Sequence, residues 1–136
     1  MADRGYRGRP QRGERADRQI NSGHSRGLDA ALSDTEAKIR KLKTERIYAY
    51  DKDGKEIAHS RTGKARSTQL PFGYSYKDAI ITHNHPKGSL GDTIAGRVGV
   101  ILSGADIFTT IAHNASEIRA VTGNYTYSLK RPSKGW

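Results

Sequence analysis

The chain has 136 residues and a formal net charge of +10, with 24 Lys and Arg residues against 14 Asp and Glu residues. It contains no cysteine, which excludes disulfide bonds and thiolate metal sites. No apolar run approaches the ~20 residues of a membrane-spanning helix, and no apolar segment of the signal-peptide type follows the start. The sequence therefore predicts neither a membrane span nor a signal peptide.

The first 27 residues differ in composition from the rest of the chain. They contain seven Arg and five Gly residues and almost no aliphatic ones. Such a segment cannot bury enough apolar area to offset the entropy lost on ordering. We therefore predict a disordered basic arm over residues 1–27 and a folded domain over residues 28–136. The arm can contact nucleic acid or another acidic surface through its arginines, or it can simply keep the chain soluble.

The folded part begins with a predicted helix over residues 32–45. Leu32, Ile39 and Leu42 recur there at helical spacing, with lysines between them. Ser33 with Glu36 three residues later is the pattern of a capping box at the helix start. The sequence therefore places the helix start at Ser33.

A hairpin is predicted over residues 46–60, where Ile and Ala alternate with two tyrosines and an Asp-Gly turn precedes a return strand. Residues 61–76 show no period and predict a loop, with at most a short edge strand. Residues 78–83 are a short apolar run of the buried-strand type. Residues 87–99 contain four glycines and predict a flexible loop.

The last elements are a helix and a second hairpin. Residues 103–115 predict a helix with Ile107 and Ile111 facing inward, together with Phe108 and Ala112. Residues 117–130 alternate on both sides of a Gly-Asn turn, as in a hairpin, and a polar tail ends the chain. The element order predicts an α/β (α+β) fold, in which helices flank a mixed β-sheet.

Two histidines at the end of the predicted central strand suggest a metal site. His83 and His85 are two residues apart, so a strand would turn both side chains to one face. Two imidazoles on one face can both approach a zinc ion at ~2.0–2.1 Å. Pro86 then ends the strand. The alternative is a pair of hydrogen-bonded structural histidines before a turn.

A zinc site needs a third protein ligand, and in a chain without cysteine this must be a carboxylate or another histidine. The nearest downstream carboxylates are Asp92 and Asp106. Asp92 lies in the glycine-rich loop, and Asp106 in the first turn of a predicted helix. Ser103 and Asp106 also match a capping box, a purely structural role that is compatible with metal binding. For the other histidines, His24, His59 and His113, we expect solvent exposure.

The motif "THNHP…LSGAD" resembles the signature of the JAMM (JAB, MPN+) metalloproteases, His-x-His-Pro followed by Ser-x-x-Asp. The RadC-like branch is the nearer match. The flanking hairpins are similar to those of RadC-like domains and of domains at the ends of phage minor head proteins, over roughly residues 36–136. The resemblance implies a three-layer fold like that of JAMM proteins and cytidine deaminases.

The resemblance also implies a role for each matching residue. His83, His85 and Asp106 match the zinc ligands. Ser103 matches a serine that helps to stabilise the oxyanion, and Glu45 matches the glutamate that serves as general base and acid. A solvated carboxylate between Lys43 and Arg46 is the alternative for Glu45.

One departure from the family pattern concerns the spacer before the serine. In this chain 16 residues lie between Pro86 and Ser103, and the family spacer is much shorter. If the extra residues loop out, Asp106 can still reach the metal, because the cost of loop closure grows slowly with length. Otherwise Asp92 substitutes for it, or the site is degenerate.

The resulting expectation is a Zn²⁺-dependent hydrolase of a peptide or isopeptide bond, encoded by a phage or another mobile element. Its partners would be a protein or peptide substrate and phage structural proteins, and its location the bacterial cytoplasm or the virion. One alternative is a non-catalytic phage structural or nucleic-acid-binding module with the same fold. The other is a metal-dependent nuclease, suggested by the basic charge and the letters "HNH".

Overall fold

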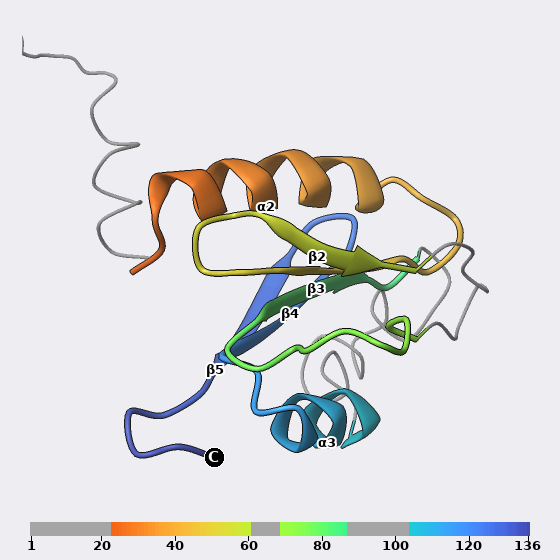
Figure 1. Ribbon diagram of the computed structural model, residues 1–136. Coiled ribbons are helices and arrows are strands. Elements are labelled where there is room, and N and C mark those ends of the chain that lie inside the picture. Colours follow the sequence, from red (N-terminus) through yellow and green to blue (C-terminus); the bar gives the residue numbers. More distant parts are fainter. Residues whose placement is uncertain (1–22, 61–68, 87–103) are drawn as a thin grey trace, which may run out of the picture.

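A computed structural model describes residues 23–60, 69–86 and 104–136 of the chain (Figure 1). A mixed sheet of five strands forms its centre, with the strand order β2-β1-β3-β4-β5. The strands are β1 (Ile47–Tyr50), β2 (Glu56–His59), β3 (Ile80–Asn84), β4 (Glu117–Val121) and β5 (Thr126–Lys130). Only β3 and β4 pair in parallel; the other neighbouring pairs are antiparallel.

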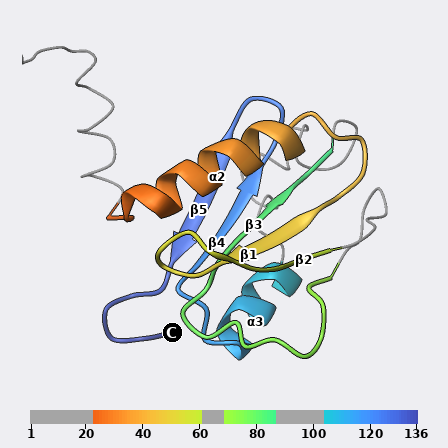
Figure 2. The ribbon, with the colours of Figure 1, turned by 45° about the horizontal axis from the view of Figure 1, so that its top comes forward.

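Two helices cover opposite faces of this sheet, as Figures 1 and 2 show. They are α2 (Arg26–Ile39) and α3 (Gly104–Ala112). The α3 helix lies in the connection between β3 and β4, because two parallel neighbours can be joined only by a crossover. The predicted α+β class with helices flanking a mixed sheet is therefore confirmed. Neither described helix is long and apolar enough to cross a membrane.

Both predicted hairpins are present. In the β1–β2 turn, the Asp51 carboxylate accepts hydrogen bonds from the backbone N–H groups of Asp53 and Lys55, both at 2.9 Å. In the β4–β5 turn, the Thr122 N–H donates to the carbonyl of Tyr125 at 2.9 Å, which encloses the two predicted turn residues, Gly and Asn. The local turn residues were therefore sufficient to predict both hairpins.

The predicted start of the first helix is wrong. The N-cap is Ser25, whose hydroxyl accepts a hydrogen bond from the Leu28 N–H, and not Ser33, which lies exposed inside α2. The helix also ends at Ile39, so Leu42 lies beyond it and is 37% exposed. The boundary drawn between residues 27 and 28 consequently falls within α2.

The capping-box prediction failed because Glu36 has a different partner. Its carboxylate is buried against the sheet and receives two hydrogen bonds from the Arg119 guanidinium, at 2.7 and 3.0 Å. Thr82 donates a third, at 2.6 Å. A charged pair with this bidentate geometry stabilises Glu36 far more than the backbone cap of a helix can.

The same buried network extends to the N-terminal end of α2. Arg119 also donates to Glu117, and Glu117 accepts further hydrogen bonds from Ser128 and His24. Burial would raise the pKa of Glu117, but these donors hold it below its usual value. His24, expected to be exposed in the arm, instead lies 2.7 Å from Glu117 and 3.1 Å from Asp29.

Replacing Arg119 by leucine is expected to lower the free energy of unfolding by about 3–5 kcal/mol, because two buried carboxylates would lose their cation. Burial disfavours the charged guanidinium, yet Glu36 and Glu117 together raise the pKa of Arg119 above its ordinary value. Urea unfolding followed by circular dichroism measures the loss. Arg26→Leu, an exposed site at the start of α2, is the control. Equal stability of the two variants would show that the network is not stabilising.

Candidate metal centre

The strand β3 places His83 in the middle of the sheet. All five residues of β3 are buried, and His83 is 3% exposed. Its neighbours on the adjacent strands are Ile47 on β1 and Ala120 on β4. An imidazole set between an aliphatic side chain and a methyl group is held rigidly and is shielded from water.

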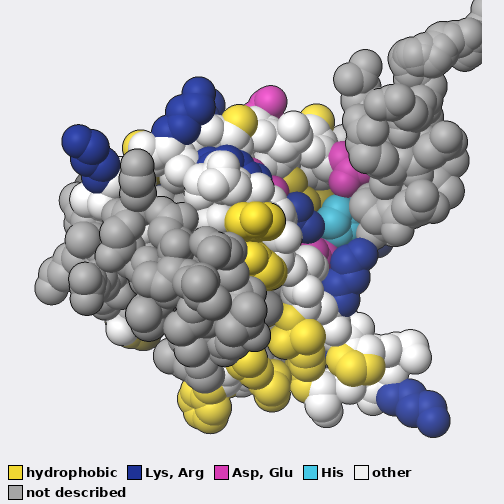
Figure 3. Space-filling view, turned by 180° about the vertical axis from the view of Figure 1, so that it is seen from behind, with side chains coloured by type: hydrophobic (Ala, Val, Ile, Leu, Met, Phe, Trp, Pro, Cys, Tyr) yellow, Lys and Arg dark blue, Asp and Glu magenta, His cyan; other side chains and the backbone are white. Residues whose placement is uncertain are grey.

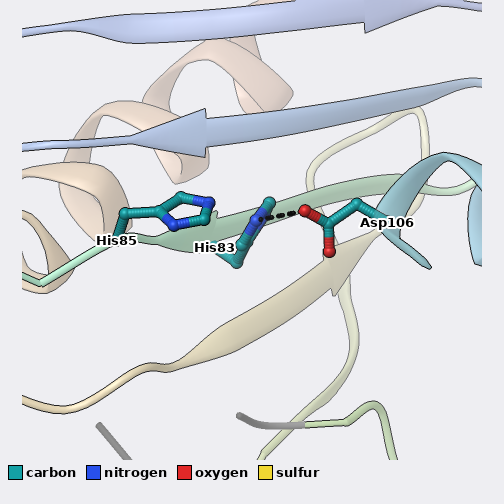
Figure 4. Close-up of side chains that lie close together, drawn as sticks. All are labelled: His83, His85 and Asp106. Atoms are coloured by element: carbon teal, nitrogen blue, oxygen red, sulfur yellow. Dashed lines mark ion pairs between the residues drawn. The ribbon is translucent and has the colours of Figure 1, made fainter. Parts of the chain in front are cut away.

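His85 lies just beyond the end of β3 and continues its geometry. Its backbone N–H donates to the Val121 carbonyl at 2.8 Å, as in the parallel ladder of β3 and β4. The strand alternation therefore turns His85 toward the same face as His83. The two ring centroids are 5.0 Å apart, with an angle of 60° between the planes. The predicted co-facial pair is present (Figure 4).

The helix α3 brings Asp106 to this pair. An Asp106 carboxylate oxygen lies 3.2 Å from Nε2 of His83. One ligand atom from each of His83, His85 and Asp106 can be chosen so that all three lie within 4.8 Å of one another. Figure 4 shows the three side chains converging from β3 and α3. Tetrahedral ligands at ~2.0–2.2 Å from zinc lie roughly 3.4 Å apart, so the three side chains would have to move closer together to hold the ion.

The surroundings of His83 are those that a metal ligand needs. Both ring nitrogens are buried and meet no strict hydrogen-bond geometry among the described residues, although Nε2 forms an ion pair with the Asp106 carboxylate at 3.2 Å. A buried polar group without a well-aligned hydrogen bond is costly, and a metal ion would satisfy Nε2. Burial lowers the pKa of His83, but the carboxylates of Asp106 and Glu45 outweigh this and leave the pKa above its ordinary value. The two carboxylates thus favour positive charge at this position, whether a proton on His83 or a bound cation.

Glu45 lies close to the same group, although it is not one of the three ligands. It is 9% exposed, and its charge interacts with both His83 and Asp106. Burial raises its pKa above the ordinary value, and Asp106 adds to this effect while His83 opposes it. A buried carboxylate with a raised pKa is a candidate for proton transfer.

Asn84 holds the segment that carries Glu45, a role that the sequence reasoning missed. Its side-chain oxygen accepts a hydrogen bond from the Arg46 N–H at 2.6 Å, and its amide group donates to the Thr44 carbonyl at 3.1 Å. Both bonds flank Glu45 directly. The available signal was strand alternation, because a residue between two co-facial histidines must point to the opposite side.

The orientation of α3 differs from the prediction. Phe108 is 72% exposed and Ile111 is 45% exposed, and Ala112 is exposed as well. The α3 helix is at the bottom of the molecule in Figure 1, and hydrophobic side chains are visible at the bottom of the view from behind in Figure 3. The buried residue is Thr110, whose hydroxyl donates to the Asp106 carbonyl at 2.7 Å. Because Asp106 and Thr110 share a helix face, turning Asp106 toward the histidines turns Phe108 outward.

The remaining predicted site residues fall elsewhere. Ser103 and Asp92 lie outside the described residues, as does the long spacer after Pro86. His59 is exposed on β2 and pairs with Glu56. His113 follows α3, is exposed, and touches the Tyr76 ring edge-on.

Comparison with known proteins found no relative of this chain. No family model matches the chain, and neither a curated protein nor a solved structure matches it.

Proposed function

We propose that this protein is a zinc-dependent hydrolase that cleaves a peptide or isopeptide bond. The observation that carries the proposal is the convergence of His83, His85 and Asp106, with the buried Glu45 beside them. Two imidazoles and one carboxylate form a common ligand set of catalytic zinc, which keeps a coordination position open. A structural zinc site would use four protein ligands instead.

Each residue has a distinct part in this chemistry. His83, His85 and Asp106 would hold the ion, which would polarise the scissile carbonyl and make a water molecule more acidic. Glu45 would take the proton of that water and deliver it to the leaving amine. Burial raises the pKa of the Glu45 carboxyl group and so makes it a stronger base. A stronger base suits both steps, because it accepts a proton from water more readily and can then donate it to the amine.

Zinc removal and restoration test this function directly. The chain, purified in zinc-containing buffer and dialysed, is expected to retain one zinc ion. Mass spectrometry of a peptide library that includes isopeptide-linked peptides should reveal cleavage that a chelator abolishes and added zinc restores. A folded chain that retains no zinc would contradict the proposal. Zinc retention without any cleavage would favour the non-catalytic alternative.

A further inference from the structure

The connection between α2 and β1 concentrates positive charge. Residues 38–46 include five Lys and Arg residues and a single acidic one, Glu45. The adjoining stretches 23–37 and 47–60 each contain more acidic than basic residues. A local excess of this size attracts anions within about a Debye length of the surface, ~8–10 Å.

This basic segment lies beside the C-terminal end of the central strand β3, where the candidate metal centre is found. It leads directly into Glu45, and the Asn84 N–H donates to the Arg46 carbonyl at 3.3 Å. Figures 1 and 2 both show the connection from α2 to β1 beside the end of β3. Lys and Arg side chains project at this corner in Figure 3, at the upper left.

The two arginines of the segment are engaged within the protein. Arg40 donates to the carbonyls of Thr122 and Tyr125, both at 2.8 Å, and thereby ties the end of α2 to the β4–β5 turn. Arg46 folds back onto the Thr44 hydroxyl at 2.9 Å. Both guanidinium groups thus already donate to acceptors within the protein.

The three lysines behave differently. Lys38, Lys41 and Lys43 are exposed, and none makes an ion pair with a carboxylate in the described part of the chain. Lys38 lies in the last turn of α2, where a cation also suits the helix dipole. Lys41 and Lys43 lie beyond the helix end, so an interaction with the helix dipole does not account for their positions as well. We call these three residues the lysine rim.

We propose that the lysine rim binds an acidic segment of the protein substrate and guides the adjoining bond toward the metal centre. This inference rests on the proposed function and adds the substrate class, a peptide with carboxylates near the cleaved bond. A peptide is favoured over nucleic acid because the arginines, which bind phosphate in the bidentate manner, are occupied. Leu42 and Tyr125, 37% and 49% exposed, add apolar contact area at the same corner.

The test is a nuclear magnetic resonance titration of the full ¹⁵N-labelled chain. The probes are a short peptide of alternating Glu and Ser, the same peptide with Gln for Glu, and a single-stranded DNA of equal charge. The Glu peptide is expected to shift the amide signals of residues 38–46, and the Gln peptide is not. Lys41→Glu/Lys43→Glu should weaken binding of the Glu peptide by about tenfold.

Lys52→Glu/Lys55→Glu is the matched control. It makes the same change in net charge on the exposed β1–β2 turn, at the opposite end of the strands, and should alter affinity less than about twofold. Equal weakening by both pairs, or shifts confined to residues 1–22, would overturn the inference. Tighter DNA binding at residues 38–46 would overturn it in favour of nucleic acid. Zinc content and binding of the Glu peptide are measured separately. A failure of the lysine-rim inference would abolish peptide binding alone, and a failure of the proposed hydrolase function would show as a chain without zinc.

Discussion

Replacing Glu45 by glutamine is expected to preserve zinc binding and to reduce hydrolysis by about 10²–10⁴-fold. Glutamine keeps the size of the side chain but cannot accept a proton from water at neutral pH. Because Glu45 is outside the group of three ligands, the ion should remain bound. The two measurements are zinc content after dialysis and the cleavage rate of the peptide identified in the library screen.

The control for this variant is Glu56→Gln, which makes the same chemical change at an exposed position on β2, where the Glu56 carboxylate lies 2.6 Å from Nδ1 of His59. Its cleavage rate should equal that of the wild type. Two results would contradict the role assigned to Glu45. One is retained hydrolysis in Glu45→Gln, and the other is loss of zinc from that variant.

Replacing His83 by alanine is expected to lower zinc affinity by more than about 100-fold. Loss of an outer partner of a ligand typically costs 10–100-fold, and loss of the ligand itself should cost more. His83 lies centrally, with its nearest carboxylate oxygen at 3.2 Å on Asp106. Competition with a chromophoric chelator measures the affinity.

Two further variants separate ligand loss from misfolding. His59→Ala removes an exposed imidazole on β2 and should leave affinity unchanged. Asp106→Asn alters a half-buried helix side chain without leaving a cavity, and it should also weaken zinc binding. Wild-type affinity in both His83→Ala and Asp106→Asn, with native circular dichroism spectra, would exclude this metal centre.

Local sequence patterns predicted the elements whose stability is decided by nearby residues. The turn residues specified both hairpins, since the Asp51 carboxylate and the Gly-Asn pair form their bonds within the turn itself. The apolar run before His83 predicted the central strand β3, because a short run of this kind is typical of a strand buried on both faces.

Contacts between distant segments overrode local patterns in both helices. Ser33 and Glu36 have the spacing of a capping box, but Arg119, far along the chain, binds Glu36 and leaves Ser25 to cap α2. Phe108 and Ile111 have the composition of an inward helix face, but Asp106 and Thr110 occupy that face instead. Hydrophobic periodicity identifies the apolar face of a helix. It does not predict that a polar contact will orient another face toward the core.

The sequence by itself determined that His83 and His85 share one face. In any strand, successive side chains point to opposite faces, so two residues at i and i+2 point the same way whatever surrounds them. The absence of cysteine likewise restricted the remaining ligand to a carboxylate or a histidine. Only the tertiary structure decided that Asp106 and Glu45 join the histidines. That outcome depends on where the crossover places α3 and on how β1 pairs with β3. The position of α3 and the pairing of β1 with β3 depend on packing between distant segments. The spacing of residues along the chain does not predict such packing.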